Sequence, residues 1–64
     1  MKDVRTVRVD DVVEFHLGDS HLYGTVEKKV IDAEGEIILF IRVKNHLYRN
    51  IPLQALIHNF GSEE

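Results

Sequence analysis

The feature that most constrains this chain is a series of short apolar stretches separated by turn residues roughly every ten positions. Residues 12–17 alternate with the two-residue period of a half-buried strand, which places Val13, Phe15 and Leu17 on one face. The glycine and aspartate within 18–20 suit a tight turn. Because no window shows sustained helical periodicity, the sequence predicts an all-β fold.

Three further strands are predicted, separated by two more turns. The strands are 21–31, 37–44 and 46–51, and the turns are 32–36 and 44–45. In the first of these strands Leu22, Val26 and Val30 share a face. Gly24 lies on that face and permits a sharp bend or a close backbone approach. The second turn uses Asn45, which tolerates the left-handed conformation.

The two ends of the chain carry weaker signals. A leading strand is predicted over 5–9 and a closing strand over 57–60. Before the closing strand, Pro52 cannot donate a ladder hydrogen bond, and residues 53–56 suit one short helical turn. Together these elements predict a small antiparallel barrel of about five strands, with one short 3-10 turn before the last strand.

The tripeptide His-Leu-Tyr occurs twice, at 21–23 and at 46–48, each time directly after a turn. Strand alternation predicts that Leu22 and Leu47 point inward, while each histidine and tyrosine points outward. The residues that flank the two copies do not match. The echo therefore indicates strand patterning and not an internal duplication.

The chain of 64 residues allows a single domain over 1–64, with the barrel at about 7–60 and a frayed acidic tail at 61–64. So short a chain buries only about 60% of its unfolded surface, and the absence of cysteine removes disulfides as further support. No signal-peptide core is evident, and the apolar run 37–41 is far shorter than the roughly 20 residues that span a bilayer. We therefore expect a cytoplasmic protein without a membrane partner.

Three segments together resemble the bacterial small barrels of the Src-homology-3-like (SH3-like) class, and are most similar to KOW and Tudor-type modules. They are VRVDDVVEF at 7–15, GTVEKKV at 24–30 and NIPLQALI at 50–57. Such families typically place a Gly-Asp pair before a strand and a Gly-x-Val in the second strand. The matching positions are 11–13 and 24–26, with Asp10 where the families favour glycine. The resemblance covers about 7–60 and implies a fold more than an activity.

The topology implied by this resemblance places the second and fourth strands on either side of the third. One outer face would then gather aromatic and basic side chains, namely His21, Tyr23, Arg42, Lys44, His46 and Tyr48. Single-stranded nucleic-acid binders use this mixture, because bases stack on aromatic rings while Arg and Lys contact phosphates. A peptide groove, or ordinary strand residues covering the barrel wall, are the alternatives. The net charge of −3 argues mildly against non-specific nucleic-acid binding.

Ile38 and Phe40 are candidates for a protein interface. If the odd-numbered residues of 37–43 fill the interior, these two side chains lie outside, where apolar surface often marks self-association or partner docking. The alternative is cover from within the chain. The residues available for this are Val4, Val7 and Phe60.

Catalysis, a metal centre and a cofactor find no support in the sequence. The carboxylate pairs at 10–11 and at 34 and 36 lie in predicted turns, and neither serine stands in a nucleophile motif. No two of the four histidines are three or four positions apart, and no cysteine is present. We therefore expect a non-catalytic binding module whose partner is nucleic acid or protein. A homo-oligomer, or a small regulator that blocks a host protein, is the alternative.

Overall fold

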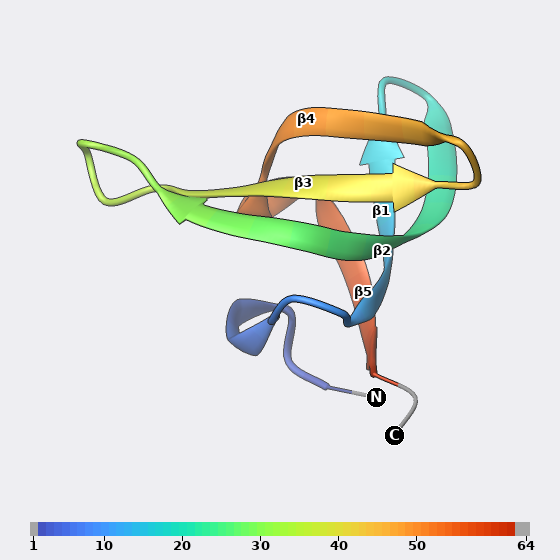
Figure 1. Ribbon diagram of the computed structural model, residues 1–64, viewed down its shortest axis with the longest axis horizontal. Coiled ribbons are helices and arrows are strands. Elements are labelled where there is room, and N and C mark those ends of the chain that lie inside the picture. Colours follow the sequence, from blue (N-terminus) through green and yellow to red (C-terminus); the bar gives the residue numbers. More distant parts are fainter. Residues whose placement is uncertain (1, 63–64) are drawn as a thin grey trace.

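The computed structural model describes residues 2–62, which form five strands and two single 3-10 turns. The elements are η1 (Val4–Thr6), β1 (Val12–Leu17), β2 (Ser20–Ile31), β3 (Ile37–Val43), β4 (His46–Pro52), η2 (Leu53–Ala55) and β5 (Leu56–Gly61). All neighbouring strands are antiparallel, in the order β4-β3-β2-β1-β5 (Figure 1). The predicted all-β class, the five strands and the 3-10 turn before the last strand are confirmed. Closure of the sheet into a barrel stays a prediction.

β2 connects the two halves of the sheet by bending near Gly24. Its residues 20–25 pair with β1, and its residues 25–31 pair with β3. A Cβ atom on Gly24 would lie 2.5 Å from the backbone oxygen of Arg42 and 2.7 Å from a methyl carbon of Ile41. Only glycine fits here without movement of β3, as the sequence predicts. Beyond the bend, β1 and β5 run across the direction of β3 and β4 (Figure 1).

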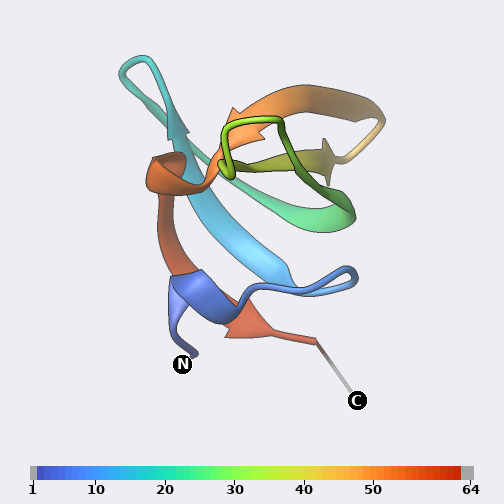
Figure 2. The ribbon, with the colours of Figure 1, turned by 90° about the vertical axis from the view of Figure 1, so that its left-hand side faces the viewer.

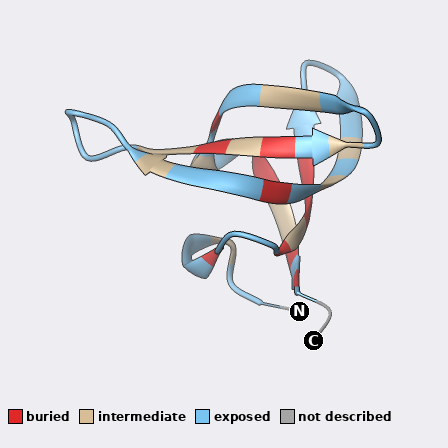
Figure 3. Cartoon of the chain, in the orientation of Figure 1, coloured by how far each residue is buried: buried red, intermediate tan, exposed pale blue. Residues whose placement is uncertain are grey.

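The bend folds the two halves of the sheet over one hydrophobic core. Its buried members are Val7, Val13, Phe15, Val26, Leu39, Ile41, Ile51, Ala55 and Leu56. Buried residues lie along β1 and β5 and in the middle of β2 and β3 (Figure 3). Leu17, predicted on the inner face of β1, is 44% exposed because it ends the strand beside the turn.

The predicted leading strand over 5–9 is wrong, because this segment contains the 3-10 turn η1. Asp3 favours the turn: its side-chain Oδ1 accepts a hydrogen bond from the backbone of Arg5, and its carbonyl accepts one from Thr6. η1 lies beside β5 (Figure 2), to which Lys2 adds an isolated bridge at Asn59. Of the predicted tail, Gly61 ends β5, and residues 63–64 lie outside the described residues.

Two buried polar side chains, Asp11 and Asn59, tie the amino-terminal segment to β5. Asp11 Oδ2 accepts hydrogen bonds from Arg8 N at 2.9 Å and from Asn59 Nδ2 at 3.3 Å. Asn59 Oδ1 accepts from the backbone of Gly61 at 2.9 Å. Throughout residues 2–62, no buried side-chain nitrogen or oxygen lacks a partner. Satisfied in this way, the pair avoids the cost of burying polar groups without hydrogen bonds.

The Gly24 contact predicts the effect of a single methyl group. Gly24→Ala should lower the free energy of unfolding by about 1–3 kcal/mol, because the added Cβ overlaps the backbone oxygen of Arg42 and methyl carbons of Ile41 and Val43, which have little room to move. Urea unfolding measures the change. Thr25→Ser, at the exposed neighbouring position, is the control and should stay within about 0.5 kcal/mol of the wild type. Equal stability of Gly24→Ala and the wild type would contradict the close approach.

Candidate functional site

β2 carries a bulge at Glu27. Val26 pairs with Ile41, and the next pair joins Lys28 to Phe40, so Glu27 is an extra residue on β2. A bulge shifts the alternation of all residues beyond it and re-aims the side chains beside it. Because Val26 is buried, Glu27 and Lys28 both lie on the outer face, the side of the sheet away from the core.

The Glu27 bulge changes the direction of the rest of β2. Lys29 turns toward the inner side, where its Nζ donates a hydrogen bond to the carbonyl of Val7 at 3.1 Å. Val30 pairs with Ile38 on the outer face. The prediction that Val30 shares the inner face of Leu22 is therefore wrong, since it assumed an unbroken alternation.

β4 carries a second bulge, at the same level of the sheet. Its pairing moves from Tyr48 to Ile51 while β3 advances by only two residues, so Arg49 and Asn50 both lie opposite Phe40. Asn50 adopts the left-handed conformation, with φ of 59°, which asparagine tolerates better than most residues. Phe40 thus has an extra residue on each of its two neighbouring strands.

The second bulge also reverses the second His-Leu-Tyr copy. Tyr48 packs against the core, with its ring edge-on to Phe15 at a centroid distance of 5.9 Å. Leu47 pairs with Arg42 on the outer face, and His46 contacts Tyr48 at a ring distance of 4.3 Å. The predictions that Leu47 points inward and that Tyr48 points outward are wrong, because alternation is interrupted between Tyr48 and Ile51. His46 is exposed, as predicted.

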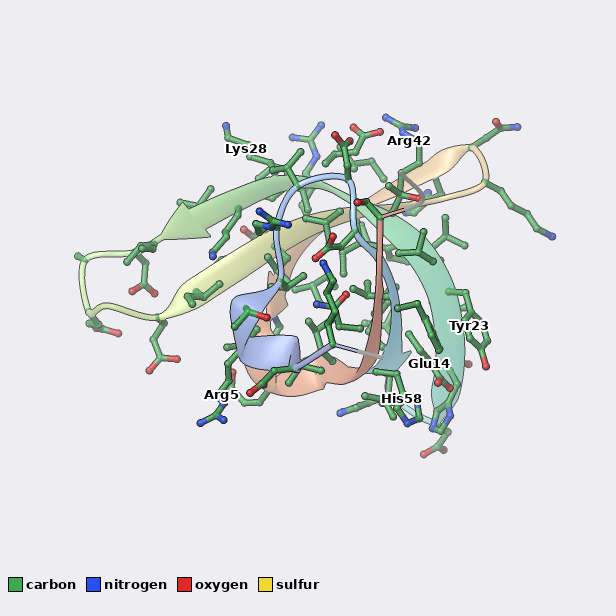
Figure 4. The ribbon with its side chains drawn as sticks, turned by 90° about the horizontal axis from the view of Figure 1, so that it is seen from below. Arg5, Glu14, Tyr23, Lys28, Arg42 and His58 are labelled. Atoms are coloured by element: carbon green, nitrogen blue, oxygen red, sulfur yellow. The ribbon has the colours of Figure 1, made fainter. Side chains whose placement is uncertain are left out.

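The first His-Leu-Tyr copy follows the prediction, but it lies elsewhere. Leu22 packs against the core, while His21 and Tyr23 lie on the outer side of β2, next to β1. Lys44 is in the β3–β4 turn, where it, and not Asn45, takes the positive φ of 56°. The six predicted binding residues therefore do not form one face. Figure 4 shows Tyr23 and Arg42 on different sides of the molecule.

Two cations flank the ring of Phe40 on the outer face. Lys28 Nζ lies 5.5 Å and Arg49 Cζ 5.9 Å from the ring centroid. The phenyl ring is partly exposed, and both cationic residues are exposed. Cation–π contacts at such sites contribute about 0.5–1 kcal/mol each. We call Lys28, Phe40 and Arg49 the Phe40 patch.

An ion pair borders the Phe40 patch. Arg42 Nε donates a hydrogen bond to Glu27 Oε2, and Arg42 Nη2 lies 3.4 Å from Glu27 Oε1. The hydrogen bond from Arg42 holds the pKa of the Glu27 carboxyl below its ordinary value, so the carboxylate is charged at neutral pH. Lys28 and Arg42 lie along the same side of the molecule (Figure 4).

Ile38 extends the Phe40 patch with apolar surface. It pairs with Val30 on one side and with Pro52 on the other, and it is partly exposed. The residues available to cover Ile38 and Phe40 from within the chain make other contacts. Val7 lies in the core, Val4 packs against it, and Phe60 stacks on Tyr23.

A separate cluster surrounds Glu14 on the outer side of β1. Its side chain is only 10% exposed, and its two carboxylate oxygens lie 2.8 Å from His58 Nδ1 on β5 and 3.4 Å from His21 Nδ1 on β2. Tyr23 and Phe60 stack beside it at a centroid distance of 6.3 Å. Figure 4 shows Glu14 next to His58. One carboxylate therefore links three strands and turns the Nδ1 atoms of two imidazoles toward itself.

An open groove of about 520 Å³ lies between η1, η2 and the β2–β3 turn. Its lining consists of Val4, Arg5, Gly35, Glu36, Ile37, Leu53, Gln54 and Leu56. Arg5 forms an ion pair with Asp3 at 2.8 Å.

Within residues 2–62, no group of three or more His, Cys, Asp or Glu side chains could hold a metal ion. No helix in that range is long and apolar enough to cross a membrane.

Lys28 and Arg49 are not predicted as site residues, yet the sequence pattern around each of them indicates a bulge. Unbroken alternation would place Lys28 on the apolar face of 22–30, and Arg49 on that of 47–51. A charged side chain in an otherwise apolar face is costly to bury, and a bulge at that point removes the conflict. Glu14 left no such signal, because its partner His58 is 44 positions away in the sequence.

Comparisons with family models, with curated protein sequences and with solved structures gave no match to the chain.

The two tyrosines of the repeated tripeptide should respond differently to truncation. Tyr48→Ala should cost about 2–4 kcal/mol of unfolding free energy, somewhat below the range for a fully buried aromatic ring, because Tyr48 is partly exposed. Tyr23→Ala, at a position 59% exposed, should cost less than about 1 kcal/mol. Chemical denaturation of both variants measures the difference, and the reverse order would contradict the bulge in β4.

The Glu14 cluster predicts a pH dependence of stability. The hydrogen bond from His58 holds the pKa of Glu14 below its ordinary value of 4.5. The stability that this carboxylate contributes is therefore present above about pH 4.5 and is lost as the pH falls through the lowered pKa of the folded state.

Glu14→Gln removes this titration. The unfolding free energy of the wild type should therefore fall more steeply below pH 4.5 than that of Glu14→Gln. Glu34→Gln, in the exposed β2–β3 turn, controls for the loss of one charge. Parallel curves for Glu14→Gln and the wild type would contradict the prediction.

Proposed function

We propose that this chain is a small non-catalytic binding module that holds single-stranded nucleic acid on the outer face of β2, β3 and β4. The observation that carries the proposal is the Phe40 patch, in which two bulges place Lys28 and Arg49 at one aromatic ring. Single-strand binders combine these two elements, a ring on which a base stacks and cations that contact the backbone phosphates.

The relative energies favour a base over the cations as the partner of Phe40. Stacking of a base on an aromatic side chain contributes about 1–3 kcal/mol. The exposed cation–π contacts that it would replace contribute about 0.5–1 kcal/mol each. A displaced Lys28 or Arg49 then becomes free to contact a phosphate, so the two contributions reinforce each other.

The charge of this face is more favourable than that of the whole chain. Lys28, Arg42 and Arg49 carry three positive charges against the one negative charge of Glu27, which leaves a local excess of two. The chain as a whole has a net charge of −3, so long-range attraction of a polyanion is weak. We therefore expect modest affinity that falls with salt, because phosphate contacts release counterions.

A titration with a short mixed-sequence single-stranded RNA, followed by backbone amide NMR, tests the proposal. Shifts should cluster around Lys28, Phe40 and Arg49 and should weaken as salt is raised. Phe40→Ala should reduce affinity by about 1–3 kcal/mol, the value of one stacked base. Tyr23→Ala is the matched control, because it removes an exposed ring that lies away from the Phe40 patch, on the part of β2 that pairs with β1.

Two results would contradict the proposal. The first is an absence of shifts at low salt, and the second is binding that depends on Tyr23 and not on Phe40. The second result would return the site to the predicted face of His21 and Tyr23.

The competing function is self-association through the same face. Its specific support is the apolar group formed by Val30, Ile38 and Pro52 beside Phe40. Exposed apolar surface of this kind is typical of protein contacts. Amide shifts of Val30 and Ile38 that change with protein concentration in the absence of RNA would favour a homo-oligomer and contradict the nucleic-acid proposal.

A further inference from the structure

The Glu27–Arg42 ion pair has a defined place relative to the Phe40 patch. Arg42 lies two residues after Phe40 on β3, on the same outer face, and pairs with Thr25 and Leu47. Glu27 is the extra residue of the β2 bulge and directly precedes Lys28. Without the bulge, Glu27 and Lys28 would lie on opposite faces of β2. The same backbone irregularity therefore delivers a cation and a carboxylate to one face.

The ion pair occupies the Nε/Nη2 fork of Arg42, one of the donor pairs that can bind a phosphate. Two guanidinium nitrogens, Nε and Nη2, face the two carboxylate oxygens of Glu27. Arginine recognises phosphate through the same forked arrangement of donors. Both side chains are 42% exposed, so a ligand can reach the pair, but a phosphate that takes the Nε/Nη2 fork must displace the carboxylate.

We propose that Glu27 is a specificity-determining residue that competes with ligand phosphate for Arg42. This inference rests on the proposed nucleic-acid function. Because Glu27 pairs with Arg42, only Lys28 and Arg49 of the three cations on this face are free to contact phosphates. Stacking of a base on Phe40 then supplies most of the remaining binding energy. A single strand supplies the unstacked base, whereas a duplex offers chiefly its phosphates. The ligand class selected is therefore single-stranded nucleic acid with at least one accessible base.

Removal of the Glu27 charge should strengthen binding of the single strand and also increase binding of a duplex. In Glu27→Gln, Arg42 gains a phosphate contact, which makes the slope of log affinity against log salt more negative by about 0.7 for a single strand. Affinity for the short single-stranded RNA should rise roughly fivefold at about 0.1 M salt, by that slope. A short DNA duplex of the corresponding sequence should gain at least as much, because each phosphate contact on B-form DNA changes that slope by about 0.9.

Three variants separate this effect from a general change of charge. Glu34→Gln removes the same charge in the exposed β2–β3 turn and should change affinity less than Glu27→Gln. Arg42→Ala should weaken binding, because it leaves the Glu27 carboxylate without its partner. Glu27→Gln combined with Arg42→Ala should return affinity and salt slope to near the wild-type values. An unchanged urea unfolding midpoint would show that each variant keeps its fold.

The outcomes distinguish this inference from the function on which it rests. If the wild type binds the RNA in a Phe40-dependent way, but Glu27→Gln changes affinity no more than Glu34→Gln, the role of Glu27 is overturned and the binding function stands. If the wild type does not bind, or binds without dependence on Phe40, the proposed function and the role of Glu27 both fail. A tighter, more salt-sensitive Glu27→Gln that reverts with Arg42→Ala supports both.

Discussion

The register around Phe40 is the constraint on which the rest of this structure depends. One residue of β3 faces an extra residue on β2 and another on β4. Because side chains alternate along a strand, each bulge exchanges the inner and outer residues beyond it. On β4 the exchange brings Tyr48 onto the core, and on β2 it turns Lys28 outward. The same two irregularities thus complete the core and assemble the Phe40 patch.

The bend at Gly24 acts together with these bulges. It lets one long strand pair with β1 in its first half and with β3 in its second, so a single sheet covers both sides of a small core. So short a chain buries too little surface to tolerate much loss of packing. The buried Asp11–Asn59 pair and the Glu14 carboxylate add cross-strand links at the β1–β5 end, where η1 also packs.

Regular alternation and turn chemistry predict the strands well, and local irregularity explains what they miss. The five strands, the short turn after Pro52 and the bend at Gly24 follow from residues that are close in sequence. The candidate site does not, because a bulge is set by pairing between distant strands. Each bulge still leaves a local trace, since Lys28 and Arg49 interrupt faces that are otherwise apolar. The Glu14–His58 contact leaves none.

Nuclear Overhauser effects from the Tyr48 ring test the central claim most directly, because the position of this ring reports the β4 bulge without any ligand. The account predicts strong effects to the ring protons of Phe15, together with cross-strand effects between Leu47 and Arg42. Effects from Tyr48 to the outward side chain of Arg42, with Leu47 in contact with Phe15, would show an unbroken strand. That result would contradict both the inverted tripeptide and the origin of the Phe40 patch.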